Sequence, residues 1–212
     1  MSDLHISVSG TKRLLTAGKR HEKNIVITAQ GGDSHYDTFW DTYQKNGAAF
    51  NYSYAFAGNG WTDAIYNPKY EIYSISNAVG MFMYNGSITT TKVPITTDAE
   101  NQNCTSIFVG AYALKTIPSI KVTEKCRTFQ SWFNECYALE EINFTQDSVI
   151  KANIAFQNSP KLTNQSVQSL INVLKDLTGE SSQTLTLHAD VGNKLTDAQK
   201  AAITAKNWTL VY

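Results

Sequence analysis

Histidine and carboxylate side chains first come together at residues 35–41, where His35 is followed by Asp37 and Asp41. Such a group could perform general acid–base chemistry, because imidazole and carboxylate groups exchange protons near neutral pH. The same segment is expected to open a helix, and acidic residues in a first helical turn stabilise the positive end of the helix dipole. We therefore assign the two aspartates a structural role and predict no catalysis there.

The other catalytic patterns are incomplete. Glu140 and Glu141 are adjacent, so on a strand their side chains point to opposite faces and do not form an acid–base pair. His188 lies near Asp190, but no serine or cysteine motif accompanies them, as a nucleophilic triad requires. The Gly-Lys pair in segment 17–19 lacks phosphate-loop spacing. The sequence therefore predicts no enzyme, and a glycan hydrolase would need two carboxylates roughly 5 to 9.5 Å apart across a groove.

The cysteines Cys104, Cys126 and Cys136 are odd in number and lack the Cys-x-x-Cys spacing of redox and metal sites. Because no second Cys/His pair is close to them, a zinc site is not expected. Small buried thiols in a reducing compartment are the simpler interpretation. We predict no metal and no cofactor.

Aromatic side chains are concentrated between residues 50 and 66, in a glycine-containing segment that is expected to be a loop. Tyrosine and tryptophan combine an apolar ring with a polar tip, which suits recognition of a sugar or a protein. The candidate binding residues are Tyr52, Tyr54, Trp61 and Tyr66. The alternative, which the sequence favours without deciding, is that these rings cover the first repeat as part of an N-terminal cap.

A pattern recurs in the middle of the chain: a phenylalanine, a small residue three positions later and an aliphatic residue six positions later. The phenylalanines are Phe82, Phe108, Phe133 and Phe156, at intervals of 26, 25 and 23 residues. One copy cannot bury its apolar side alone, so neighbouring copies must stack. The pattern predicts an α/β repeat fold, a short leucine-rich-repeat-like solenoid over residues 71–162 in which each copy supplies a strand and a turn.

The position three after each phenylalanine must be small where coils pack closely, which gives Cys136 a packing role without chemistry. Within the repeat region 96–107, residues 98–104 lack clear strand character, so one repeat is expected to be irregular there. Polar residues on the predicted strands form rows that are either a binding face or a solvated one. They are Thr89, Thr90, Thr91, Ser119, Lys121, Asn143 and Thr145.

Residues 1–70 are expected to hold strands, an aromatic helix and a cap loop. Segments 4–8 and 24–28 are predicted strands, with a turn at 9–12. Aromatic residues at i, i+3, i+4 and i+7 predict an amphipathic helix of about ten residues. They are Tyr36, Phe39, Trp40 and Tyr43. The helix should end near Gly47, because glycine readily adopts the left-handed conformation that follows a helix.

Residues 163–212 are expected to form a helix–strand–helix–strand cap, which a stack of repeats needs at its open end. Thr163 is the predicted N-cap of the first helix. The apolar residues of that helix are Val167, Leu170, Ile171, Leu174 and Leu177. Thr196 and Gln199 fit a capping box at the start of a helix over 197–206, and segments 184–187 and 208–212 are predicted strands.

The balance of charge limits the partners. Eighteen basic and 18 acidic side chains cancel, whereas nucleic-acid binding depends on basic patches that neutralise phosphates. We find no basic–apolar signal sequence and no apolar run of the roughly 20 residues that would span a bilayer. Nucleic-acid binding and membrane insertion are therefore not expected. We expect the protein to be synthesised in a cytoplasm.

Several motifs of this chain occur together in a known module. They are segments 10–19, 24–26, 37–44 (DTFWDTYQ), 55–62 (AFAGNGWT), 68–70 (PKY) and 206–209 (KNWT). Their order, with the repeats between them, resembles over nearly the whole chain a group of phage and prophage proteins of Firmicutes with BspA-like leucine-rich repeats.

The resemblance implies a virion-associated accessory protein of the tail, baseplate or head fibre, made in the host bacterial cytoplasm without a signal peptide. Its partners would be other virion proteins, or a glycan or protein of the host surface, and it supplies no catalytic residues. The alternative function is an intracellular phage-encoded inhibitor that binds and masks a host protein. Homo-oligomerisation, the ligand and the position in the particle stay open.

Overall fold

The computed structural model describes residues 5–8, 11–14, 50–58, 61–64, 66, 68, 71–72, 75–97, 105–129 and 131–212. Near the N-terminus, β1 (His5–Val8) and β2 (Thr11–Leu14) form an antiparallel hairpin. Val8 pairs with Thr11, so β2 begins inside the segment 9–12 that was predicted to be a turn. The predicted strand at 24–28 and the predicted helix at 36–43 lie outside the described residues.

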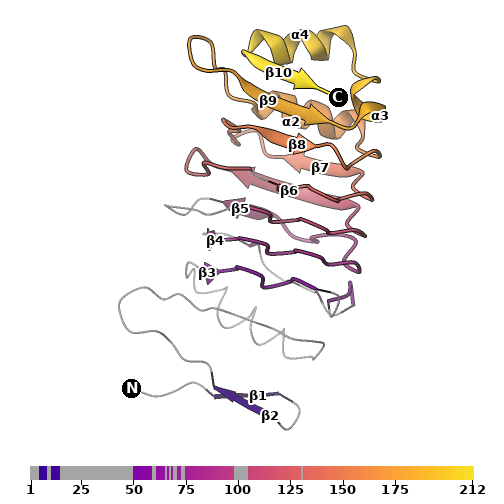
Figure 1. The fold of residues 1–212 in the computed structure, drawn as a ribbon. Helices are drawn as coiled ribbons and strands as arrows, with labels where there is room; N and C mark the ends of the chain where they lie inside the picture. The colour runs from indigo at the N-terminus through magenta and orange to yellow at the C-terminus, as the bar shows by residue number, and fades with distance from the viewer. Residues whose placement is uncertain are drawn as a thin grey trace.

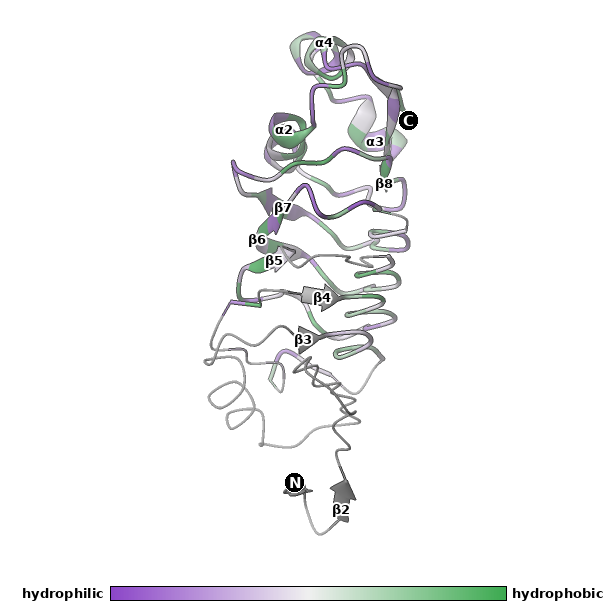
Figure 2. Cartoon of the chain, turned by 90° about the vertical axis from the view of Figure 1, so that its left-hand side faces the viewer, coloured by the Kyte–Doolittle hydropathy of each residue, from purple (hydrophilic) through white to green (hydrophobic). Residues whose placement is uncertain are grey.

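From residue 50 onward the described segments wind into coils that stack in chain order (Figure 1). In the middle of the stack, β5 (Ile95–Thr97), β6 (Thr116–Val122) and β7 (Glu141–Phe144) form a parallel sheet in that order. Ile95 pairs with Ile120, and Ile117 pairs with Ile142. Parallel neighbours require a crossover connection, and here the remainder of each coil provides it. Figure 2 shows these strands along one side of the stack and the turns along the other.

The first coils also contain a parallel pair, β3 (Phe50–Asn51) with β4 (Ile75–Asn77). The stack therefore begins within the segment 1–70 that the sequence assigned to the N-terminal cap. Thr96 and Thr97, at the start of the region 96–107, lie in β5. Residues 98–104 of that region are outside the described part of the chain.

A column of phenylalanine rings runs through the coils, in which the first pair is tilted and the later pairs are stacked. Its members are Phe56, Phe82, Phe108, Phe133 and Phe156, with successive ring centroids 5.1, 5.4, 5.4 and 4.3 Å apart. All five side chains are buried. Aromatic pairs contribute about 0.5–1.5 kcal/mol each beyond the burial of their area, so this column is a main source of cohesion between coils. Four of its members are the phenylalanines of the predicted repeat, and Phe56 adds one earlier coil.

The position three after phenylalanine is buried in every copy, as Asn85, Ala111, Cys136 and Ser159. Two of these side chains make the same contact with the preceding coil. The Asn85 amide donates to the carbonyl oxygen of Phe56 at 3.2 Å, and the Cys136 thiol donates to that of Phe108 at 3.1 Å. The position therefore accepts a small side chain that packs or donates a hydrogen bond to the coil before it.

In the C-terminal segment the first helix lies beside β7, on the strand side of the stack (Figure 2). α2 (Asn164–Val173) has Thr163 as its N-cap, which confirms that prediction. The helix ends at Val173, before the predicted core residues Leu174 and Leu177, although both of these are buried. The capping box of Thr196 and Gln199 is present at the start of α4 (Asp197–Ala205) and is likewise confirmed.

Two C-terminal strands extend the other side of the stack. β8 (Ile154–Phe156), β9 (Gln183–Leu187) and β10 (Trp208–Val211) form a second parallel sheet, in which β9 is central. β9 and β10 confirm the two predicted strands of the cap. The short helix α3 (Ala189–Gly192), which the sequence did not predict, precedes α4.

α2 also protects the exposed edge of β7. The Ser166 hydroxyl accepts a hydrogen bond from the backbone N–H of Ile142 at 3.0 Å, and the Ser169 hydroxyl accepts one from Phe144 at 2.8 Å. Because the two serines are three positions apart, they lie on one face of the helix. The two hydroxyls take the place of a next strand. They accept from backbone N–H groups of β7 that would otherwise be free to pair with the strand of another molecule.

Candidate binding surface

Three of the four residues predicted to bind a ligand lie in the core. Tyr52, Trp61 and Tyr66 are at most 2 % exposed, and the Tyr66 hydroxyl donates to the carbonyl oxygen of Thr91 at 2.9 Å. The rings of Trp61 and Tyr66 each lie 5.0 Å from the ring of Phe56, centroid to centroid. These three rings cover the first phenylalanine of the column, which agrees with the cap alternative, and their burial leaves them almost no surface for a ligand.

The fourth residue, Tyr54, points to solvent and is 49 % exposed. The segment alternates, so that Tyr52 and Phe56 turn inward while Tyr54 between them turns outward. A ligand-binding role for Tyr54 stays a prediction.

The turns of successive coils share one backbone conformation. Each has two left-handed residues four positions apart, with the buried phenylalanine midway between them. The first positions are Tyr54, Gly80, Ser106 and Ser131, and the second are Gly58, Tyr84, Gly110 and Glu135, with φ between 54° and 80°. Hydrogen bonds join equivalent turns, for example from the N–H of Phe56 to Met81 O at 2.8 Å and from Phe82 to Ile107 O at 2.7 Å. The described turns therefore share one backbone geometry and one pattern of hydrogen bonds.

Tyrosine at these left-handed positions is unfavourable locally. A residue with a side chain loses roughly 1–2 kcal/mol in this conformation, whereas glycine adopts it freely. Tyr54 and Tyr84 nevertheless occupy it, and each ring lies against a glycine of the next coil. A Cβ on Gly80 would be 2.6 Å from Tyr54 Cε1, and one on Gly110 would be 3.0 Å from Tyr84 Cε1. The missing side chains of the two glycines make room for the rings.

Three exposed tyrosines form a contiguous row on consecutive turns. Tyr84 and the Tyr112 hydroxyl both border Gly110, where a Cβ would be 3.3 Å from that hydroxyl. The Tyr112 and Tyr137 rings are stacked, with centroids 6.2 Å apart and planes 11° apart. Tyr84, Tyr112 and Tyr137 are 52, 42 and 49 % exposed, and we call them the tyrosine row.

One carboxylate is tied to the tyrosine row. The Tyr112 hydroxyl donates to Glu135 Oε2 at 3.0 Å, and this hydrogen bond is the main reason that the pKa of Tyr112 is raised. The backbone N–H of Glu135 donates to Asn158 Oδ1 of the next coil at 3.3 Å. Glu135 thus orients the hydroxyl of Tyr112, and the next coil in turn holds the backbone of Glu135.

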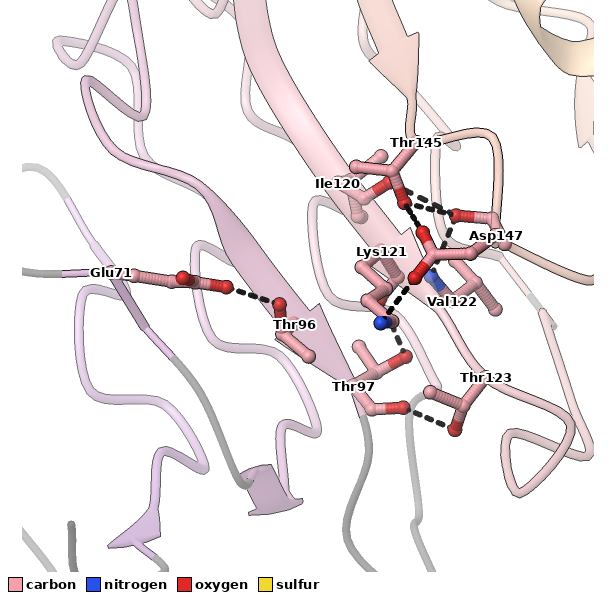
Figure 3. Close-up of polar contacts among 10 residues, drawn as sticks. Glu71, Thr96, Thr97, Ile120, Lys121, Val122, Thr123, Thr145 and Asp147 are labelled. Atoms are coloured by element: carbon pink, nitrogen blue, oxygen red, sulfur yellow. Dashed lines mark hydrogen bonds and ion pairs between the residues drawn. The ribbon is translucent and has the colours of Figure 1, made fainter.

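Polar side chains at the end of the β5–β6–β7 sheet bind one another instead of facing solvent singly (Figure 3). Lys121 forms an ion pair with Asp147, which also accepts a hydrogen bond from Thr145 at 2.6 Å. Both contacts lower the pKa of Asp147. The Thr123 hydroxyl donates to Thr97 O at 2.7 Å. These groups join neighbouring coils, which favours the interpretation that the predicted polar rows at Lys121 and Thr145 are structural.

Two shallow depressions border α2. One, of about 500 Å³, lies between α2 and α4 and is lined mainly by Gln165, Gln168, Thr196 and Gln199. The other, of about 130 Å³, lies between α2 and the β6–β7 face, where Glu141 is the single carboxylate in its lining. Neither depression contains the two facing carboxylates of a glycoside hydrolase.

The residues considered for other chemistry have structural roles in the part of the chain that is described. Burial raises the pKa of the Cys136 thiol to about 12, so it is protonated near neutral pH. His188 is the N-cap of α3 and accepts the backbone N–H of Asp190 at 3.1 Å. Among described residues, no cluster of three or more potential metal ligands is present. No described helix is both long and apolar enough to cross a membrane.

The sequence interpretation missed Tyr84, Tyr112 and Tyr137 as surface residues. A signal was available for two of them, because Tyr112 and Tyr137 each stand four after the repeat phenylalanine in the shared segment Tyr-Ala-Leu. Tyr84 stands two after its phenylalanine and carries no comparable signal. Its exposure depends on a left-handed backbone that only the structure shows.

Comparison with protein-family models gave no match, and comparisons with curated proteins and with solved structures gave none either. The geometry and the sequence motifs therefore carry the functional proposal.

Proposed function

We propose that this protein is a non-enzymatic virion accessory protein of a phage, placed at the tail, baseplate or head fibre, whose stacked coils bind a glycan or a protein. We further propose that the stack is a short leucine-rich-repeat-like solenoid of the BspA-like type with a cap at each end. The assignment to a virion rests on the resemblance of motifs 37–44, 55–62 and 206–209 to phage proteins.

The observation that carries the binding role is the tyrosine row. Large aromatic side chains about half exposed are normally scattered singly on a surface, whereas contiguous ones mark interaction sites. Here they lie on consecutive turns, and Tyr84 is retained despite an unfavourable backbone conformation. The polar groups of Figure 3, by contrast, are engaged with one another.

The test is mass spectrometry of gradient-purified particles of the phage that encodes the chain. The proposal predicts peptides of this protein at a constant ratio to the major capsid protein across the particle peak. If the protein is present in the lysate but absent from that peak, the virion role is wrong. A stoichiometric host protein recovered with it from infected cells would then favour the inhibitor alternative.

A further inference from the structure

We infer that the tyrosine row of Tyr84, Tyr112 and Tyr137 binds a neutral carbohydrate chain, whose sugar rings pack against the exposed parts of these side chains. The inference rests on the binding role proposed above and deepens it by naming the surface and the class of ligand.

The rings are held in place before any ligand arrives. Tyr84 is supported by the backbone of Gly110, and Tyr112 is fixed by stacking on Tyr137 and by its hydrogen bond to Glu135. Ordering a side chain on binding costs roughly 0.5–1.5 kcal/mol, and this cost is small where the side chain is already fixed. A rigid row suits a weakly binding ligand such as a sugar, because little of the interaction is lost in ordering the protein.

The composition of the surface favours a sugar over a protein partner. Among the described residues, the large exposed hydrophobic side chains are tyrosines, with the single exception of Val211. The centre of a protein–protein interface is normally built from a broader apolar patch, about 800 Å² on each partner. A row one side chain wide, with apolar faces and hydroxyl edges, instead matches a pyranose ring, which has a C–H face and a rim of hydroxyls.

The charge near the row favours a neutral ligand. The charged group bonded to the row is Glu135, which accepts from the Tyr112 hydroxyl. A carboxylate accepts hydrogen bonds from sugar hydroxyls but repels phosphate or uronate groups. The row also repeats with the coils, so a linear chain can place successive sugars along it.

The experiment uses the full-length chain and an array of soluble bacterial cell-surface oligosaccharides, neutral and anionic, of tetrasaccharide length or longer. A neutral member that binds is then titrated by isothermal calorimetry against wild type, Tyr84→Gly and Tyr112→Ser. Tyr84→Gly removes the ring and relaxes the backbone at once, so it keeps the test valid if Tyr112→Ser fails to fold. The matched control is Tyr212→Ser, since Tyr212 is an exposed tyrosine outside the row.

The inference predicts that each row variant weakens binding by roughly ten-fold or more while Tyr212→Ser leaves it unchanged. It is overturned if only anionic members bind, if no neutral member binds, or if the control loses as much affinity as the row variants. Capture of a protein through the row, without oligosaccharide binding, also overturns it. These outcomes are independent of whether the protein is found in particles, so failure of the virion proposal is recognised separately.

Discussion

The ring of Tyr84 lies against the backbone of Gly110 on the next coil, at a point where any side chain on Gly110 would collide with it. Both residues have a left-handed backbone and occupy the same position of consecutive turns. The surface tyrosine and the glycine above it are therefore one structural unit, in which the second residue sets the orientation of the first.

Gly110→Ala should destabilise the fold by about 2 kcal/mol or more, because it combines an unfavourable φ with displacement of the Tyr84 ring. Gly179→Ala is the control, since Gly179 also has a positive φ but no atom within 4 Å of an added Cβ. It should lose about 1 kcal/mol. Urea unfolding of both variants measures the difference, and equal losses would show that the Tyr84 contact contributes nothing.

The burial of Cys136 should make the stability of the fold depend on pH in the alkaline range. Its pKa is raised to about 12 in the folded protein, so the unfolded chain releases this proton first. Stability is then fully present below the ordinary thiol pKa and is lost as the pH rises through the folded value, by at most about 1.4 kcal/mol per pH unit. Between those two pKa values, Cys136→Ala should lose stability less steeply than wild type. Parallel slopes for the two proteins would contradict the assignment.

Because two serines of α2 protect the edge of β7, replacing either serine should lower the stability of the fold. Ser166→Ala and Ser169→Ala should each cost about 1–3 kcal/mol, because each leaves a backbone N–H of β7 without its acceptor. Ser181→Ala, at an exposed position in the loop before β9, is the control and should stay within about 0.5 kcal/mol. Thermal or urea unfolding measures the stability of each variant. A loss of stability no larger than that of the control would show that the β7 edge does not depend on these hydroxyls.

Lys206, which follows α4 in the chain, caps the C-terminal end of α2. Its ammonium group donates to the carbonyl oxygens of Ile171 at 2.9 Å, Asn172 at 3.2 Å and Leu174 at 2.9 Å. Lys206→Met should therefore destabilise the protein by about 1–2 kcal/mol, since carbonyls at the end of a helix lose a charged donor. Lys194→Met, at an exposed position, should have little effect on the same unfolding midpoint. Equal midpoints for the two variants would refute this capping role.

The sequence predicted the features that depend on local pattern. Phe82, Phe108, Phe133 and Phe156 recur at nearly constant spacing because each coil must place one ring over the last. Thr163 and the pair Thr196 and Gln199 were identifiable because capping depends on neighbours three residues away. Thr96 and Thr97 pair with β6 despite being polar, whereas residues 98–104, on which the expected irregular repeat depends, lie outside the described part of the chain, and that expectation stays a prediction.

The binding surface was not predictable in the same way. Tyr52, Tyr54, Trp61 and Tyr66 are chemically alike in the sequence, and only the direction of each side chain in the coil separates Tyr54 from the other three. Tyr84 is exposed because its backbone is left-handed. Glycine occupies the equivalent position in the coils before and after it, at residues 58 and 110. Such a pattern is recognised only after the coils have been aligned in space.

Adsorption of fluorescently labelled protein to intact cells of the phage host tests the central claim most directly. We would compare wild type with the triple variant Tyr84→Gly, Tyr112→Ser, Tyr137→Ser, after confirming that both unfold cooperatively. The account predicts saturable binding of the wild type and a loss of roughly ten-fold or more in the folded triple variant. Equal binding of both folded proteins would show that the tyrosine row is not the recognition surface.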